Sequence, residues 1–137
     1  MMTALCLAAK NGVDVRIMTP GTPDKKLVFL LTQSYYRQLL ENGVKIYEYQ
    51  PGFLHAKTFV CDDEIAVVGT INLDYRSLYL HFEDGVWIYG NDVIWSMKED
   101  FVQTLEDCHT VPLEFCKNRK IPVHIMQNVL RAFAPML

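Results

Sequence analysis

Histidine, lysine, threonine and asparagine side chains are grouped in the middle of the chain, where Lys57 lies two residues after His55 and where Thr70 and Asn72 follow. On a β-strand, residues i and i+2 project from the same face, so His55 and Lys57 would present an imidazole and an ammonium side by side. Lys57 would supply positive charge, and Thr70 and Asn72 would supply hydrogen-bond donors. Because His55 could attack phosphorus or transfer a proton, the grouping predicts a site for a phosphate oxyanion.

These side chains belong to a longer pattern of fixed spacing, HxKxxxxDxxxxxxG(S/T)xN. The chain meets it at each specified position: His55, Lys57, Asp62, Gly69, Thr70 and Asn72. In this pattern the chain resembles the phospholipase D superfamily. Two further segments, Leu73-Asp74-Tyr75-Arg76-Ser77-Leu78 and His81-Phe82-Glu83, are similar to the bacterial cardiolipin synthase branch in its C-terminal copy of the motif. The resemblance extends from about residue 3 to residue 115.

The resemblance implies a phosphatidyltransferase half-domain. In enzymes of this kind two motif copies make one site: one histidine attacks the phosphodiester to give a phosphohistidine, and a second protonates the departing alcohol. This chain has a single HxK pair, so an isolated monomer is expected to be inactive. With a second copy, the implied reaction transfers a phosphatidyl group between phosphatidylglycerol molecules, giving cardiolipin and glycerol without a metal or other cofactor. His55 is favoured as the general acid rather than the nucleophile.

Two carboxylates complete the set of candidate residues that the resemblance implies. Glu83 corresponds to a family carboxylate that hydrogen-bonds the catalytic histidine, and such a partner fixes the tautomer and stabilises the imidazolium. The alternative for Glu83 is an exposed acid beside Asp84. Asp62 is the third named residue of the motif, and its acidic neighbours favour a structural or electrostatic role in a turn. The candidates are therefore His55, Lys57, Asp62 and Glu83 for catalysis, with His55, Lys57, Thr70 and Asn72 for the substrate phosphate.

Strands and helices that alternate along the chain would position these groups. Residues 2–11, 26–40 and 93–108 have helical spacing, and residues 13–20, 44–49 and 86–89 read as strands. Two β-rich runs, 54–61 and 65–69, flank an acidic turn and predict a hairpin whose second arm returns toward Thr70 and Asn72. Residues 70–81 have no clean period. The predicted fold is an α/β class, a phospholipase D-like α/β/α sandwich with a mixed central sheet and flanking helices.

The chain is expected to comprise a phospholipase D-like domain at 1–116 and a basic amphipathic C-terminal helix at 117–137. The tail contains basic residues and no acidic residue, and its apolar residues recur at helical spacing. The favoured interpretation is that the apolar stripe packs on the domain and leaves a solvated basic face. Contact with a membrane surface is the alternative.

Composition limits the remaining function classes. With 137 residues and 50% hydrophobic content the chain is a globular domain. The net charge of -3 disfavours bulk electrostatic binding of nucleic acid, so no nucleic-acid partner is expected. The four cysteines form no CxxC pair and are expected to be reduced. The apolar runs are too short for a membrane-spanning helix, and Met1–Ala9 lacks a signal peptide's basic start.

The resemblance also implies partners and a location. The expected partners are a phospholipid substrate, a membrane surface, and a second motif domain of the same chain or a homodimer mate. The parent protein would lie at the cell membrane with this domain on the cytoplasmic side. Two alternatives remain open: another phosphodiesterase of the superfamily, either a lipid hydrolase or a homodimeric nuclease, and a non-catalytic phosphate- or lipid-binding module. The net acidity and the segment after Asn72 disfavour the nuclease, and the undegraded motif disfavours the non-catalytic module.

Overall fold

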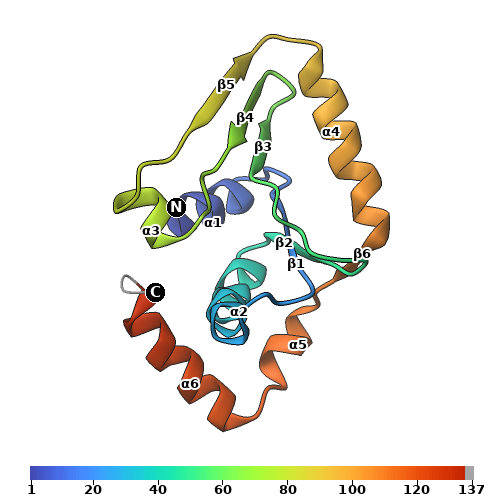
Figure 1. Ribbon diagram of the computed structural model, residues 1–137. Helices are drawn as coiled ribbons and strands as arrows, with labels where there is room; N and C mark the ends of the chain where they lie inside the picture. The colour runs from blue at the N-terminus through green and yellow to red at the C-terminus, as the bar shows by residue number, and fades with distance from the viewer. Residues whose placement is uncertain (135–137) are drawn as a thin grey trace. The chain divides into compact units, whose positions relative to one another are not determined.

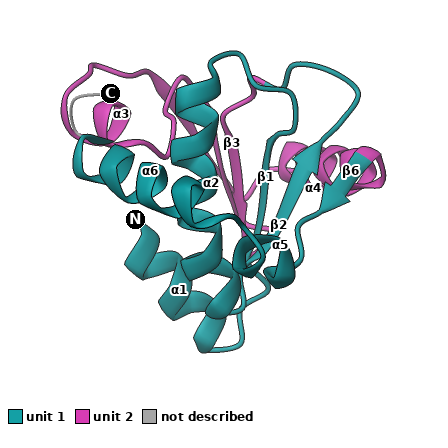
Figure 2. Cartoon of the chain, turned by 90° about the horizontal axis from the view of Figure 1, so that it is seen from below, with its two compact units in different colours: residues 1–54, 108–137 teal, residues 55–107 magenta. Residues whose placement is uncertain are grey.

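The computed structural model describes residues 1–134 and divides into two compact units. Unit 1 comprises Met1–Leu54 with Cys108–Leu137, and unit 2 comprises His55–Asp107 (Figure 2). The expected boundary at residue 116 concerns a different division of the chain and stays a prediction.

Unit 1 combines a small mixed sheet with four helices of the described chain (Figure 1). Its elements are α1 (Met2–Lys10), β1 (Arg16–Pro20), α2 (Lys26–Glu41), β2 (Lys45–Tyr49), β6 (Cys108–Thr110), α5 (Leu113–Lys117) and α6 (Ile121–Ala132). The strand order is β1-β2-β6, with β1 parallel and β6 antiparallel to β2. Because two parallel strands need a crossover connection, α2 joins β1 to β2. The predicted helices and strands of residues 2–49 are confirmed.

The core of unit 1 lies where α1 and α2 meet β2. Its buried side chains are Cys6, Tyr36, Leu39, Val44, Ile46, Val111 and Cys116. The hydroxyl of Tyr36 shares a hydrogen bond of 2.7 Å with the Thr19 hydroxyl, which satisfies both polar groups. The helix α2 ends at Glu41, with Asn42 as its C-cap, because Gly43, at φ 90°, adopts the left-handed conformation that lets the chain turn back into β2. The turn at Gly43 therefore lets β2 follow α2 and lie between β1 and β6 at the centre of the sheet.

Unit 2 is built on an antiparallel sheet with the order β3-β4-β5. Its elements are β3 (Thr58–Cys61), β4 (Ile65–Gly69), α3 (Tyr75–Tyr79), β5 (Gly85–Tyr89), α4 (Val93–Thr104) and a 3₁₀ helix (Leu105–Asp107). The helix α4 contacts β3, and Ala66 and Ile94 are fully buried. The predicted hairpin is confirmed. Its turn contains Asp62 and Asp63 at φ 52° and 58°, a left-handed conformation that aspartate tolerates better than most residues.

The expectation that His55 and Lys57 lie on a strand is wrong, because β3 begins at Thr58. The amide of Gly69 donates to the Lys57 carbonyl at 3.1 Å, which is the last contact before the hairpin opens. The next amide, that of Thr70, instead donates to the Asp84 carbonyl at 2.9 Å. Since the chain after β4 turns toward the start of β5, the pairing of β3 with β4 begins at Thr58, and His55 lies before the strand.

The predicted helix at 93–108 is shorter than expected. The helix α4 ends at Thr104, a 3₁₀ turn follows, and Cys108 begins β6. Asp92 is the N-cap residue of this helix, and the side-chain oxygen of Asn91 before it accepts a hydrogen bond of 3.0 Å from the Val93 amide.

The segment 117–137, expected to form a basic helix, contains the helix α6 at Ile121–Ala132, and its residues 135–137 lie outside the described residues. The packing predicted for its apolar stripe is wrong. The buried residues of α6 are Gln127 and Leu130, whereas Ile125, Met126 and Val129 are between 48% and 60% exposed. Figure 2 shows α6 beside α2, and these two helices are in contact. Polar pairs hold that contact, including a hydrogen bond of 3.3 Å from Gln127 Nε2 to the Leu30 carbonyl. Within residues 1–134, no helix combines the length and apolar character needed to cross a bilayer.

Candidate active site

Five of the six candidate residues from the sequence line one cavity of unit 2. The cavity has a volume of about 320 Å³, and its lining residues are His55, Lys57, Gly69, Thr70, Asn72 and Glu83. Three separate segments supply them: the residues before β3, the residues from the end of β4 to α3, and the residues before β5. The hairpin therefore brings together groups that are far apart in the sequence.

Gly69 permits the close approach of β4 and β5 that closes one side of this cavity. A Cβ atom at this position would collide with the backbone oxygen of Asp84 and with the Cα of Gly85. Only glycine avoids that collision, since it has no side chain. The glycine of the motif therefore serves strand packing, and it sets the position of Thr70 next to it.

Thr70 connects the end of β4 to the carboxylate of Glu83. Its hydroxyl donates to Glu83 Oε2 and accepts a hydrogen bond of 3.0 Å from the Asp84 amide. The hydrogen bond from Thr70 lowers the pKa of Glu83 below its ordinary value of 4.5, and a hydrogen bond with Ser77 and the nearby positive charge of Lys57 act in the same direction. Glu83 is therefore a carboxylate at neutral pH, held beside the cavity by Thr70.

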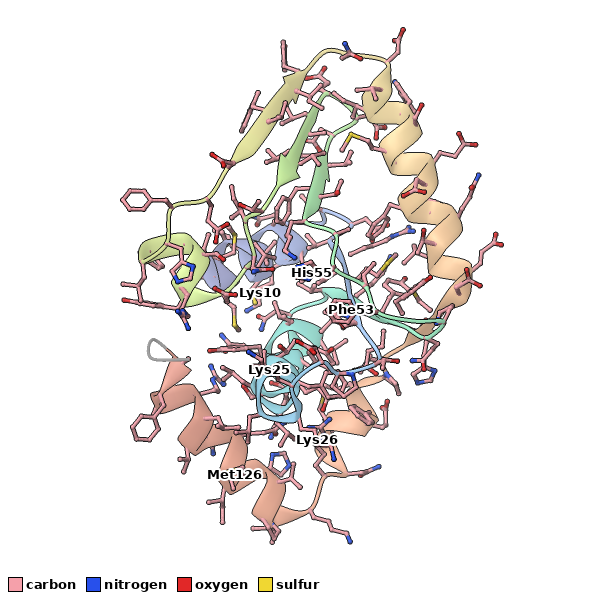
Figure 3. All side chains as sticks on the ribbon, viewed as in Figure 1. Lys10, Lys25, Lys26, Phe53, His55 and Met126 are labelled. Carbon is pink, nitrogen blue, oxygen red and sulfur yellow. The ribbon has the colours of Figure 1, made fainter. Side chains whose placement is uncertain are left out.

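His55 and Lys57 lie together on the segment that precedes β3, where Figure 3 labels His55. Lys57 Nζ donates a hydrogen bond of 2.7 Å to the backbone carbonyl of His55. An ammonium has three donors, so the same group can also reach an anion in the cavity. The imidazole is exposed and Lys57 is half-buried, which gives a substrate access from solvent.

Asn72 is positioned by the short helix α3. Its amide donates to the hydroxyl of Ser77 at 3.4 Å. The amide N–H of Ser77 is bound at 2.8 Å by the carboxylate of Asp74, which caps α3. Sequence reasoning missed the role of Ser77. The signal that could have found it is Asp74, an N-cap residue type three residues before a serine, in a stretch that has no helical period.

Asp62 is the candidate that does not line the cavity. It lies in the turn between β3 and β4, and its carboxylate accepts a hydrogen bond of 3.3 Å from the Cys61 thiol. This hydrogen bond is the main cause of the raised pKa of Cys61. The structural or electrostatic role expected for Asp62 stays a prediction, with the turn conformation as its physical basis.

The arrangement can hold and act on a phosphate ester. Lys57 and the amide of Asn72 can bind its oxygen atoms, the imidazole of His55 can exchange a proton or attack phosphorus, and Glu83 supplies a negative charge to the same cavity. Within the described part of the chain, no group of three or more His, Cys, Asp and Glu side chains is arranged to hold a metal ion.

Comparison with known proteins places the chain among relatives of one family. Residues 1–105 match the family described as "Cardiolipin synthase, PLD-like domain". The chain is 42% identical over 137 residues to a cardiolipin synthase of Geobacillus sp. (strain WCH70), with 100% of this chain and 27% of that protein covered. It is 46% identical to a cardiolipin synthase of Clostridium perfringens (strain SM101 / Type A), with 100% and 29% covered. The chain thus spans less than a third of the length of each of these two relatives.

A solved structure has a similar fold. The phospholipase D family member Nuc from Salmonella typhimurium superposes with a TM-score of 0.69 over 80% of this chain and 72% of that chain, at 20% sequence identity. The expected α/β fold of the phospholipase D type is confirmed.

Proposed function

Because the chain belongs to the cardiolipin synthase PLD-like domain family, we propose that it is one catalytic half of a phosphatidyltransferase that forms cardiolipin from phosphatidylglycerol. The observation that carries this proposal is that His55, Lys57, Thr70, Asn72 and Glu83 line one and the same cavity. We infer that the chain corresponds to the C-terminal of two motif copies. The domain would be residues 1–116, followed by the basic helix at 117–137.

The proposed reaction has two displacement steps. In the first, a histidine nitrogen attacks phosphorus of one phosphatidylglycerol, an N–P bond forms, and the P–O bond to the terminal glycerol breaks. The other histidine gives its proton to the departing oxygen. In the second, a terminal hydroxyl of another phosphatidylglycerol attacks the phosphohistidine, the N–P bond breaks, and the hydroxyl proton returns to the histidine that lost one. The products are one cardiolipin and one glycerol.

Four of the cavity residues have a direct place in this scheme. His55 acts as the general acid that protonates the departing glycerol and later accepts a proton. Lys57 and Asn72 stabilise the negative charge that grows on the phosphoryl oxygens. Glu83 stabilises the imidazolium of His55, an assignment supported by its ionised state and its place in the same cavity. Asp62 supports the hairpin turn rather than the reacting groups.

A second motif copy is needed because this chain has one HxK pair. The outer strand of unit 2 supports such a partner: on β5, Trp87 and Tyr89 are 67% and 69% exposed. Large apolar surfaces of this kind are usually covered in an assembly. Since the chain spans 27% to 30% of the length of relatives that it matches, we infer that the partner is either another part of the same protein or a second copy of the chain.

The parent enzyme would act at the cell membrane, where its phospholipid substrate resides. We infer that this domain lies on the cytoplasmic side. Its four free cysteines, Cys6, Cys61, Cys108 and Cys116, support a reducing compartment.

The test is turnover of phosphatidylglycerol vesicles by the longer protein that contains this chain. Formation of cardiolipin and glycerol in equal amounts is the expected result. Phosphatidic acid and glycerol as the main products would identify a lipid hydrolase instead. Binding without any turnover would identify a non-catalytic module.

A further inference from the structure

Unit 1 contains a second, larger cavity that the proposed reaction does not use. It has a volume of about 400 Å³ and lies between α2 and α6, with α5 at one end. We call it the arginine groove. Its lining residues are Gln33, Ser34, Arg37, Gln38, Glu41, Cys116, Arg119, His124, Gln127, Asn128 and Arg131. The volume is within the range of about 300–1,000 Å³ typical of small-molecule sites.

The groove carries an excess of positive charge. Three of its lining residues are arginines, Arg37, Arg119 and Arg131, and one is a carboxylate, Glu41. Glu41 forms an exposed ion pair of 2.9 Å with Arg37, so it offsets only part of that charge. The charges in and near the groove act on the thiol of Cys116, which lines it. Burial raises the pKa of the Cys116 thiol; the positive charges of Arg119 and Arg37 act to lower it, and the negative charges of Glu41 and Glu48 act to raise it.

Arg119 is held in place by neutral groups. The Gln33 side chain is buried, and its amide donates to the buried Glu48 carboxylate at 3.0 Å. This fixes the other end of the amide, whose oxygen accepts a hydrogen bond of 2.7 Å from Arg119 Nη2. The guanidinium of Arg119 also lies 4.5 Å from the centre of the Phe115 ring.

Arg131 is held in a similar way from the opposite helix. Its guanidinium lies 4.8 Å from the centre of the Tyr35 ring, and Nη2 donates to Gln38 Oε1 at 3.4 Å. The hydrogen bonds among the described residues use one N–H of each of the three guanidiniums. Since a guanidinium has five N–H groups, each can still bind oxygen atoms that enter the groove.

We propose that the arginine groove binds a phosphate group, carried by a free anion or by a lipid headgroup, at a site separate from the cavity that contains His55. The planar fork of an arginine matches two phosphate oxygens, and several such forks around one pocket favour phosphate over a carboxylate of lower charge. This site does not depend on the proposed transferase activity, because all of its lining residues belong to unit 1.

The lipid source is favoured by the outer face of α6. Ile125, Met126 and Val129 are exposed on the helix that also supplies Arg131, and Figure 3 labels Met126 on this helix. An exposed apolar face next to basic groups is typical of helices that lie on an anionic lipid surface. A headgroup phosphate in the groove would then be accompanied by apolar contact along α6.

The experiment measures binding by the 137-residue chain in which His55→Ala and Lys57→Ala disable the cavity of unit 2. Two probes are titrated at one fixed ionic strength: inorganic phosphate, and vesicles of phosphatidylglycerol in phosphatidylcholine, with phosphatidylcholine vesicles as the blank. The test variant adds Arg37→Gln and Arg131→Gln. The matched control adds Lys117→Gln and Lys120→Gln, which remove the same charge from exposed positions outside the groove.

The expected result is that the arginine variant binds roughly tenfold more weakly or worse, because it loses two charge-assisted contacts, while the lysine control is little changed. If the arginine variant loses binding of inorganic phosphate, a free phosphate anion is sufficient to occupy the groove. An effect restricted to phosphatidylglycerol vesicles identifies the lipid. Equal losses in both variants, or no binding of either probe, overturn the proposal. Because Arg37 is an exposed surface residue, Arg37→Gln alone serves as a variant that keeps the fold, which circular dichroism verifies.

Discussion

The side chains around the cavity of unit 2 would act on a phosphate ester in two different ways. His55 and Lys57 would contact the ester, whereas Thr70 acts through Glu83, whose carboxylate it binds. Substitutions of the first kind should slow or abolish the chemical step. Substitutions of the second kind should change how activity and stability depend on pH.

Replacing His55 with alanine in the longer protein should lower cardiolipin formation by roughly 100- to 10,000-fold, because the general acid is lost. His109→Ala is the matched control, since His109 is an exposed histidine on β6 that lies outside the cavity. Product formation from fluorescent phosphatidylglycerol measures both. Near-normal activity of His55→Ala would refute the assignment.

Glu83→Gln should move the alkaline limb of the pH–rate profile to lower pH. The glutamine keeps the shape of the side chain but removes the negative charge that would stabilise the imidazolium form of His55. The profile of kcat/KM over pH measures this shift. A profile that falls uniformly without moving would show that Glu83 does not act on the general acid.

Thr70→Val should reduce stability in a pH-dependent way. Folding lowers the pKa of Glu83, so its ionised carboxylate stabilises the fold above the ordinary value of 4.5, and this contribution is lost as the pH falls through the lowered pKa. The difference in free energy of unfolding between wild type and Thr70→Val should therefore be largest near neutral pH and shrink in acid. Urea unfolding at several pH values measures it.

Thr32→Val is the control for this comparison. The Thr32 hydroxyl donates to a backbone carbonyl in α2 at 3.0 Å and has no carboxylate partner among the described residues. Its effect on the free energy of unfolding should be independent of pH. A similar pH dependence in both variants would contradict the coupling between Thr70 and Glu83.

Among the elements, β4 and β5 approach each other so closely at Gly69 that there is no room for one more carbon atom. Gly69→Ala should lower the free energy of unfolding by roughly 1–3 kcal/mol, because the new Cβ would push the two strands apart. Gly52→Ala is the matched control, since a Cβ there meets no atom within 4 Å. That control should be neutral or slightly stabilising. Equal effects of the two substitutions on urea unfolding would contradict the close approach at Gly69.

Elements with a clear periodic or alternating pattern could be predicted from the sequence, whereas two five-residue helices and the three-residue strand β6 could not. The spacing of apolar residues predicted α2 and α6, and the alternation around an acidic turn predicted the hairpin of β3 and β4. The helices α3 and α5 have five residues each, which is too short for a period to emerge. The strand β6 has three residues and exists because it pairs with β2, a contact distant in sequence.

The packing of α6 could not be predicted from its apolar stripe, because its contact with α2 is polar. Gln127 is buried and binds a backbone carbonyl of α2, while Met126 beside it is exposed. The lining of the cavity of unit 2 could be predicted better, since the motif includes five of its six lining residues and the family resemblance adds Glu83. The contribution of Ser77 could not be predicted, because it depends on the helix α3, which is too short to show a periodic pattern.

At the scale of the whole molecule, the chain on its own has one HxK pair where the proposed mechanism uses two. A monomer of 137 residues should therefore bind phosphate-like anions but release no glycerol from phosphatidylglycerol. Sedimentation mass measured together with turnover of fluorescent phosphatidylglycerol tests this. Robust turnover by a strictly monomeric chain would show that one motif is enough. Turnover that appears only with a dimer would identify the chain itself as the second copy.

The outer position of β5 also determines how the isolated chain behaves during purification. This strand pairs with β4 along one edge, and it carries the exposed Trp87 and Tyr89. An edge strand rich in aromatic residues is a template onto which further strands can add, which leads to aggregation. The insoluble fraction is therefore expected to grow as the protein concentration rises. The substitution Trp87→Lys should raise solubility, because a charged side chain on an edge strand disfavours the addition of another strand. Trp87, the residue expected to cause aggregation of the isolated chain, would then be buried against the partner in the assembled protein.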